Sequence, residues 1–213
     1  MNEEYGESEL STLEYWKTHY RREVENYKSH GNVGDIWFGE DIVDRIVNWM
    51  NHFSRIKKTH SVLDVGCGNG MFLITLHKEG YTNLSGIDYC EAAIVLAKEV
   101  ANQFNSTIEY KVFNILEDDF QGKTYDIILD KGTYDAISLS ANAKYDKVTY
   151  GRRVSDLLQT RGLFILTSCN WTQEELLMQF NDNFTVLDVI PTPQFQFGGK
   201  LGSVVTSVVL ERK

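Results

Sequence analysis

The chain has 213 residues, a formal net charge of −9 and a hydrophobic content of 42%. This length and composition are typical of one domain with its own core, so we expect a single domain over residues 1–213. The acidic charge argues against a nucleic-acid partner, which would need a basic surface for its phosphates. Three scattered cysteines without a Cys-x-x-Cys pair favour neither a disulfide scaffold nor a zinc site. No signal peptide or membrane-spanning run is evident, and we expect a cytoplasmic protein.

Residues 1–40 are predicted to form an N-terminal segment, of which about the first ten are disordered. A helix is predicted over residues 12–27, because apolar and aromatic side chains recur there at three- and four-residue steps. They are Leu13, Trp16, Tyr20, Val24 and Tyr27. This aromatic face either packs on the domain or forms a lid over a bound cofactor. The glycine-punctuated loop over 31–40 adds the adjacent aromatics Trp37 and Phe38 and precedes a predicted helix over 41–53.

The stretch over residues 61–70 is the centre of the chain. An apolar run containing Asp64 leads into glycines at alternate positions, Gly66, Gly68 and Gly70, and a second apolar block follows. We interpret this pattern as strand, turn and helix, because glycine tolerates positive φ and lets a ligand approach the backbone. The next strand, over 84–88, ends in Asp88, about 20 residues on, where a carboxylate can bind a ribose diol. Together these features resemble the nucleoside-binding half of class I S-adenosylmethionine (SAM) methyltransferases.

The remaining elements complete an α/β fold. Further strands are predicted over about 108–113, 125–129, 162–167, 184–190 and 204–211, with helices over 91–104, 144–159 and 173–180. No helix fits between the last two strands, so we expect them to be antiparallel. The prediction is therefore a seven-stranded, Rossmann-like class I methyltransferase sheet with an antiparallel last strand and helices on both faces. The five histidines show no ligand spacing, and no metal site is expected.

Six separate stretches resemble eukaryotic elongation factor 1-alpha lysine methyltransferases of the methyltransferase-like family (yeast Efm4 type). They are Tyr15-Trp16 with Tyr20, Trp37 to Glu40, Leu63 to Gly70, Asp130 to Ile137, Thr167 to Trp171, and Pro191 to Gly199. The resemblance implies SAM as the cofactor, with contacts from Trp16, Tyr20, Trp37, Gly66, Asp88, Tyr89, Asn114, Ile115 and Lys131. It also implies a basic protein substrate, elongation factor 1-alpha. We expect a monomer without membrane association, located in the cytoplasm or, alternatively, in both cytoplasm and nucleus.

A lysine acceptor fits the residues around the fourth strand. A lysine amine is nucleophilic only after losing its proton, and a dehydrating aromatic pocket lowers its pKa. We expect Tyr134, Trp37 and Phe197 to surround this amine. Asp130, at the end of the fourth strand, is predicted to orient the amine as the catalytic residue; alternatively, it caps the following helix. Two other function classes stay open, namely a methyltransferase for a small amine or carboxylate and a non-catalytic SAM-binding module.

Overall fold

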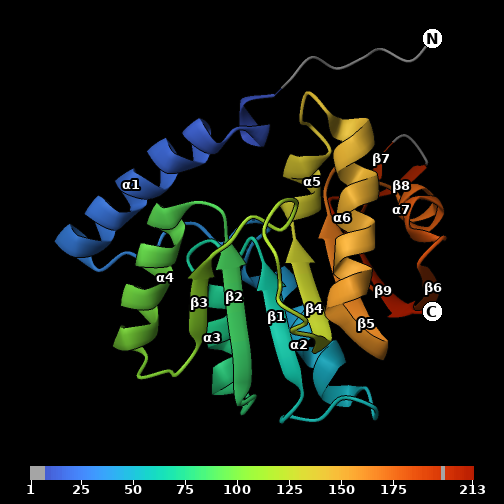
Figure 1. Cartoon of the computed structure of the whole chain (residues 1–213), viewed down its shortest axis with the longest axis horizontal. Helices are drawn as coiled ribbons and strands as arrows, with labels where there is room; N and C mark the ends of the chain where they lie inside the picture. Colours follow the sequence, from blue (N-terminus) through green and yellow to red (C-terminus); the bar gives the residue numbers. More distant parts are fainter. Residues whose placement is uncertain (1–7, 198–199) are drawn as a thin grey trace.

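The computed structural model describes residues 8–197 and 200–213, except for the side chains of 194–203. Seven strands of the described chain form one sheet in the order β3-β2-β1-β4-β5-β9-β6 (Figure 1). Their bounds are β1 Ser61–Val65, β2 Asn83–Asp88, β3 Glu109–Val112, β4 Tyr125–Lys131, β5 Leu158–Ser168, β6 Phe184–Ile190 and β9 Thr206–Arg212. Strand β9 is antiparallel to both β5 and β6, whereas the other neighbouring pairs are parallel. The predicted seven-stranded sheet with a reversed last strand is confirmed.

Helices cover both faces of this sheet. Helices α2 (Glu40–His52), α3 (Met71–Lys78) and α4 (Glu91–Gln103) pack on one face, in a core that includes Val62 and Ile127. Helices α6 (Ala143–Leu157) and α7 (Gln173–Phe180) pack on the other face, where Leu63 and Ile128 lie. Successive strand residues point to opposite faces, so the apolar runs of the sequence supply both cores.

Four elements differ from the sequence prediction. Strand β4 continues through Asp130 and Lys131, which were expected in a loop. A short helix α5 (Thr133–Ile137) follows within the same predicted loop. The loop before the last strand contains a hairpin of β7 (Gln194–Phe197) and β8 (Lys200–Ser203). Elements of four or five residues are too short to show a periodic apolar pattern, so the sequence did not indicate them.

The N-terminal segment lies over the edge at which β1 to β4 end (Figure 1). A 3₁₀ helix, η1 (Glu9–Ser11), occupies part of the segment that was predicted to be disordered up to about residue 10. Helix α1 (Leu13–His30) then packs against α4; it begins at the Thr12 cap and ends at Gly31 in the left-handed conformation. Within the described ranges, no helix has the length and apolar character needed to cross a bilayer.

Candidate functional site

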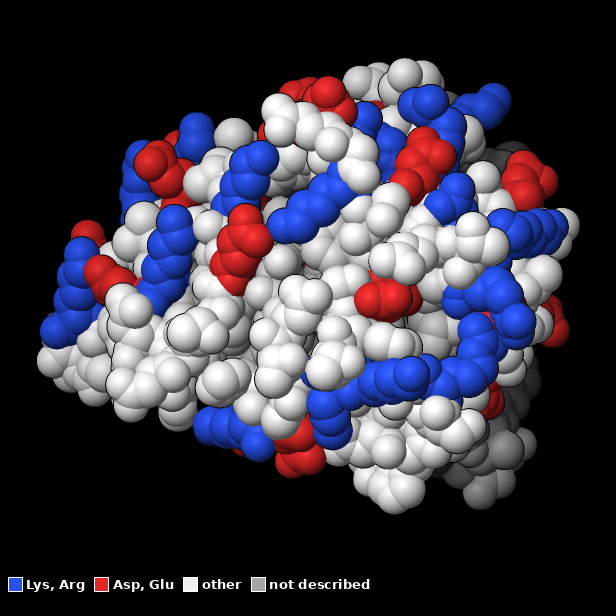
Figure 2. Space-filling model, turned by 60° about the horizontal axis from the view of Figure 1, so that its bottom comes forward, with Lys and Arg blue, Asp and Glu red and all other residues white. Residues whose placement is uncertain are grey.

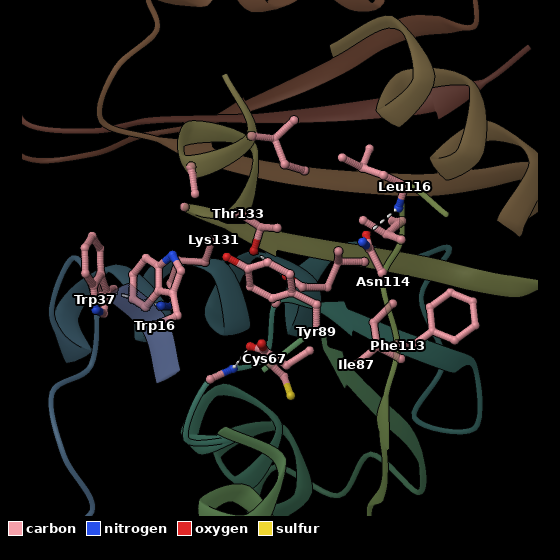
Figure 3. A pocket seen from close by; sticks show the side chains of 18 of the residues that line it. Trp16, Trp37, Cys67, Ile87, Tyr89, Phe113, Asn114, Leu116, Lys131 and Thr133 are labelled. Atoms are coloured by element: carbon pink, nitrogen blue, oxygen red, sulfur yellow. Dashed lines mark hydrogen bonds between the residues drawn. The ribbon is translucent and has the colours of Figure 1, made fainter. Parts of the chain in front are cut away.

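A cavity lies where β1, β2 and β4 end, beneath the N-terminal segment (Figure 3). Ligands of open α/β sheets bind at this carboxyl edge of the strands. Figure 3 shows Trp16 and Trp37 at one end of the cavity, Phe113 and Asn114 at the other, and Tyr89 between them. Ten of the predicted cofactor residues line it: Trp16, Tyr20, Trp37, Gly66, Gly68, Asp88, Tyr89, Asn114, Ile115 and Lys131.

The glycine turn after β1 forms one wall of this cavity. Gly66 and Gly68 both have positive φ, which side-chain-bearing residues rarely adopt. A Cβ at Gly66 would collide with the Thr133 hydroxyl, and one at Gly68 would collide with the Tyr20 hydroxyl. Thr133 Oγ1 in turn donates to the Val65 carbonyl at 2.7 Å, which fixes α5 beside the turn. Because Gly66 and Gly68 have no side chains, Thr133 and Tyr20 pack directly against the backbone of the turn.

Asp88 presents a prearranged carboxylate to the cavity. Its Oδ2 accepts a hydrogen bond from Gly68 N at 3.1 Å, and its Oδ1 accepts one from Cys90 N at 2.9 Å. Burial raises the pKa of Asp88 to about 6, and these two hydrogen bonds oppose that rise. The carboxylate is therefore mostly ionised at neutral pH. Each oxygen keeps accepting capacity for a further donor, as a vicinal diol would supply.

The aromatic end of the cavity, formed by Trp16, Tyr20 and Trp37, is linked by hydrogen bonds to the end of β4 and to the glycine turn after β1. The ring centroids of Trp16 and Trp37 are 5.2 Å apart, and those of Trp16 and Tyr20 are 6.0 Å apart. Lys131 Nζ donates to the Trp37 carbonyl at 3.0 Å, while Asn69 Nδ2 donates to the Val33 and Asp35 carbonyls at 3.0 and 3.2 Å. Sequence reasoning missed Asn69, although a side-chain amide within a glycine turn is able to bridge two loops.

The opposite end of the cavity carries backbone groups suited to a heteroaromatic base. Asn114 Oδ1 accepts a hydrogen bond from Leu116 N at 3.0 Å and thereby fixes the turn after β3. Arg153 Nε donates to the Ile115 carbonyl from the other side. The Ile115 N–H has no partner within the described chain and, like the Asn114 amide, is available to a bound ligand.

Two predicted cofactor residues lie outside the cavity lining. Gly70 packs against Tyr110, whose hydroxyl donates to the Gly70 carbonyl at 3.3 Å. Asp64 is buried in β1, and burial raises its pKa to about 7, an effect that the Lys131 ammonium opposes. Burial lowers the pKa of Lys131, which Asp64 and Asp130 oppose. Asp64 therefore does not line the cavity, and it favours the charged form of Lys131, which does.

Asp130 also lies outside the cavity lining, with its side chain buried. It accepts hydrogen bonds from Thr133 N at 2.8 Å, from Tyr134 N at 3.0 Å and from the Tyr150 hydroxyl. Burial raises its pKa to about 8. These contacts hold the start of α5, as the helix-capping alternative expects. The acceptor-orienting role of Asp130 stays a prediction.

Of the three aromatic residues expected around the acceptor amine, Trp37 lines the cavity and Tyr134 does not. Tyr134 is fully buried among Tyr150, Trp171 and Phe180 and does not line the cavity. Its hydroxyl has no hydrogen-bond partner within the described chain. Phe197 lies outside the described side chains, so its predicted place in the pocket stays a prediction.

Tyr134 and Tyr150 offer a matched test of this buried arrangement. We expect Tyr150→Phe to lower the free energy of unfolding by about 1–3 kcal/mol, because buried Asp130 Oδ2 loses one of its two donors and keeps only the Tyr134 N–H. Tyr134→Phe removes a hydroxyl that has no described partner and should change stability by less than about 0.5 kcal/mol, or raise it. Urea unfolding of both variants measures the difference. Equal losses would contradict the contacts assigned to Asp130.

Comparisons with known proteins identify the same kind of domain as the fold and the cavity do. A family model described as a methyltransferase domain matches residues 56–205. The N-methyltransferase NodS from Bradyrhizobium japonicum WM9, solved with S-adenosyl-L-homocysteine, superposes with a TM-score of 0.68 at 16% identity, over 92% of this chain and 98% of that chain. The sheet, the glycine turn and Asp88 thus define a class I methyltransferase.

Two curated relatives narrow this class. EEF1A lysine methyltransferase 2 from Homo sapiens is 42% identical over 96% of this chain and 87% of its own length. Protein-lysine N-methyltransferase efm4 from Schizosaccharomyces pombe is also 42% identical, over 95% of this chain and 93% of its own length. The chain belongs to the EEF1A lysine methyltransferase 2 (Efm4) family.

Proposed function

We propose that this protein transfers a methyl group from SAM to a lysine side chain of elongation factor 1-alpha. The observation that carries the proposal is the cavity at the carboxyl edge of the sheet, which joins a diol-binding carboxylate to an aromatic lid. The high identity over nearly the full length of lysine methyltransferases supports the choice of acceptor.

The residues of the cavity fit SAM. Asp88 would bind the ribose diol, and the Ile115 N–H with the Asn114 amide would bind the adenine. Gly66 and Gly68 line the cavity with backbone alone, and a Cβ at either position would collide with Thr133 or Tyr20. Trp16, Tyr20 and Trp37 exclude water and present aromatic faces that attract a cation. SAM supplies a methyl group activated by a sulfonium.

On the acceptor side, the main contribution of the protein is positioning. The amine must be deprotonated before it reacts, and the aromatic wall favours the neutral form by limiting hydration. Asp35, in the loop before α2, is an exposed carboxylate on the cavity wall and is our candidate for attracting the incoming ammonium group. We assign proton removal to solvent, because Asp130 is enclosed by its three donors.

We further propose a monomer in the cytoplasm, without a nucleic-acid or membrane partner. Figure 2 shows acidic side chains among basic ones over much of one face, with a run of basic side chains along its lower right. Arg55 and Arg161 both pair with Glu211, which reduces the net positive charge that they present. The net charge of −9 disfavours a partner recognised through its phosphates.

The test is a methyl-transfer assay with tritiated SAM and either purified elongation factor 1-alpha or a cell lysate. We expect one labelled protein band, and mass spectrometry should place the label on a lysine. An Asp88→Ala variant is the negative control. Label found only in small molecules would favour the small-amine alternative, and label on a different protein would overturn the choice of elongation factor 1-alpha.

The pKa of Asp88 gives a pH dependence to cofactor binding. Folding raises this pKa from an ordinary 3.8 to about 6, so Asp88 protonates in the cofactor-free protein as pH falls through 6. The Kd of SAM should then rise by up to about tenfold per pH unit below 6. The stability of the cofactor-free protein changes in the opposite direction. Its folded state binds a proton that the unfolded chain has lost, so the contribution of Asp88 to stability grows as pH falls from about 6 to 3.8 and is lost as pH rises through 6. Calorimetry from pH 8 to 5 measures the Kd. Asp88→Asn, which does not titrate, should lack this slope, and an equal slope in that variant would contradict the assignment.

A further inference from the structure

A second hollow lies on the same edge of the sheet, beyond the cofactor cavity. It is formed by the end of β5, the end of β6 and the start of β9, which meet at this edge because β9 is antiparallel to the other two. We call it the acceptor groove. Its lining residues are Ser168, Cys169, Asn170, Trp171, Thr172, Gln173, Val189, Ile190, Pro191, Thr192, Val204, Val205, Thr206 and Ser207.

The described lining of the acceptor groove carries no charged side chain. None of the described residues that line it is Lys, Arg, His, Asp or Glu, although 24% of the chain is charged. Buried Ser168, Ser207 and Val205 lie at its base, and exposed Asn170 and Val204 lie at its rim. Hydroxyl, amide and aliphatic groups match peptide bonds and neutral side chains. Among the described side chains of the lining, a phosphate or carboxylate ligand would find no cation to offset its desolvation.

Helix α5 separates the acceptor groove from the cofactor cavity and is attached to both. On one side, Thr133, Ala136 and Ile137 line the cavity. On the other side, Asp135 accepts hydrogen bonds from the Ser168 hydroxyl and from Cys169 N, the latter at 2.8 Å.

Two further hydrogen bonds connect the region of α5 to the residues of the groove. Trp171 Nε1 donates to Ser138 Oγ at 3.2 Å, and Gly132 N donates to the Thr167 carbonyl at 3.0 Å. The groove therefore has a fixed position relative to the site of methyl transfer.

We propose that the acceptor groove binds an uncharged, extended segment of the protein substrate next to the methylated lysine. This inference rests on the proposed function. A helix is about 10–12 Å across with its side chains, and an extended chain advances about 3.3 Å per residue. A residue about three or four positions from the acceptor lysine would therefore reach the groove while the lysine enters the cavity on the other side of α5. A charged residue at that position of the substrate is disfavoured.

Two valines allow a matched test. Val204 at the groove rim is 66% exposed, and Val148 on α6, outside both hollows, is 65% exposed, so arginine at either position disturbs no core. Val204→Arg should raise the KM for elongation factor 1-alpha at least about tenfold, because the bound substrate segment would bury the arginine charge without a partner. The Kd of SAM should not change. Val148→Arg should behave as wild type.

The outcomes separate this inference from the proposed function. Wild-type enzyme that does not methylate elongation factor 1-alpha would overturn the proposed function, and the groove inference with it. An active wild type together with an unchanged KM in Val204→Arg would overturn the groove inference alone.

Cys169 provides a second readout that does not depend on turnover. It is an exposed thiol of the groove, whereas Cys67 and Cys90 are buried and serve as internal references. Partial burial of the thiol and the nearby Asp135 carboxylate raise the pKa of Cys169 to about 11, so alkylation by N-ethylmaleimide is slow and easily followed by mass spectrometry. Saturating elongation factor 1-alpha with S-adenosylhomocysteine should slow the alkylation several-fold, whereas serum albumin should not. An unchanged alkylation rate in the presence of the elongation factor would contradict occupation of the groove.

Discussion

Asp88→Ala is expected to weaken SAM binding by at least about 100-fold while the protein stays folded. The carboxylate would lose two hydrogen bonds to the ribose diol, and charge-assisted hydrogen bonds contribute roughly 1.5–3 kcal/mol each. About 1.4 kcal/mol corresponds to a factor of ten in Kd. The variant also frees Gly68 N and Cys90 N, so the glycine turn loses its anchor. Isothermal calorimetry with SAM measures the loss directly.

Asp126→Ala is the matched control for Asp88→Ala. Asp126 also accepts two hydrogen bonds, from Ser61 N at 2.8 Å and from the Ser61 hydroxyl at 2.7 Å, but at the start of β4, away from the cavity. Its loss should reduce stability and leave the Kd of SAM within about twofold of wild type. Comparable losses of affinity in both variants would show that Asp88 acts only through stability.

The centre of the sheet followed from the sequence because β1, β2 and β4 are largely buried on both faces, whereas the edge strands β3 and β6 are mostly exposed. Each central strand is a short, mainly apolar run, a pattern that can be recognised without any knowledge of long-range contacts. Helix α7 and strand β6 have the predicted bounds, Gln173–Phe180 and Phe184–Ile190. The parallel order of strands then brings Asp88 and the glycine turn to one edge, which is why the nucleoside half of the site was predictable.

The acceptor half depends on contacts between distant residues. Asp130 stands at the end of a strand, where a carboxylate often faces a ligand, and the sequence does not tell which way the side chain points. In the structure its partners include Tyr150, 20 residues further along, so the carboxylate holds α5. Asn69 bridges to Val33, 36 residues earlier, and the acceptor groove unites three strand ends. Side-chain direction and these pairings are set by packing, which local patterns do not encode.

Replacing Trp16 and Trp37 together by alanine is expected to weaken SAM binding by about 100-fold and to lower kcat as well. The two indoles contact each other over the cavity, and an aromatic side chain buries about 150–250 Å² when packed. At about 25 cal/mol per Å², even partial loss of that area on the cofactor is equivalent to a few kcal/mol. Water admitted to the cavity would also hydrate the acceptor amine and favour its protonated form.

Point substitutions test the lid more sharply than removal of the whole segment. Deleting α1 would also remove buried Tyr20 and expose the face of α4 on which α1 packs. Trp49→Ala is the control, because its indole stacks on Phe53 at 4.7 Å and donates to Asp188 at 2.7 Å, outside the cavity lining. That control should lose stability and keep its affinity for SAM. If the Trp16 and Trp37 double variant kept wild-type affinity and turnover, the aromatic face would serve only to pack the N-terminal segment on the domain.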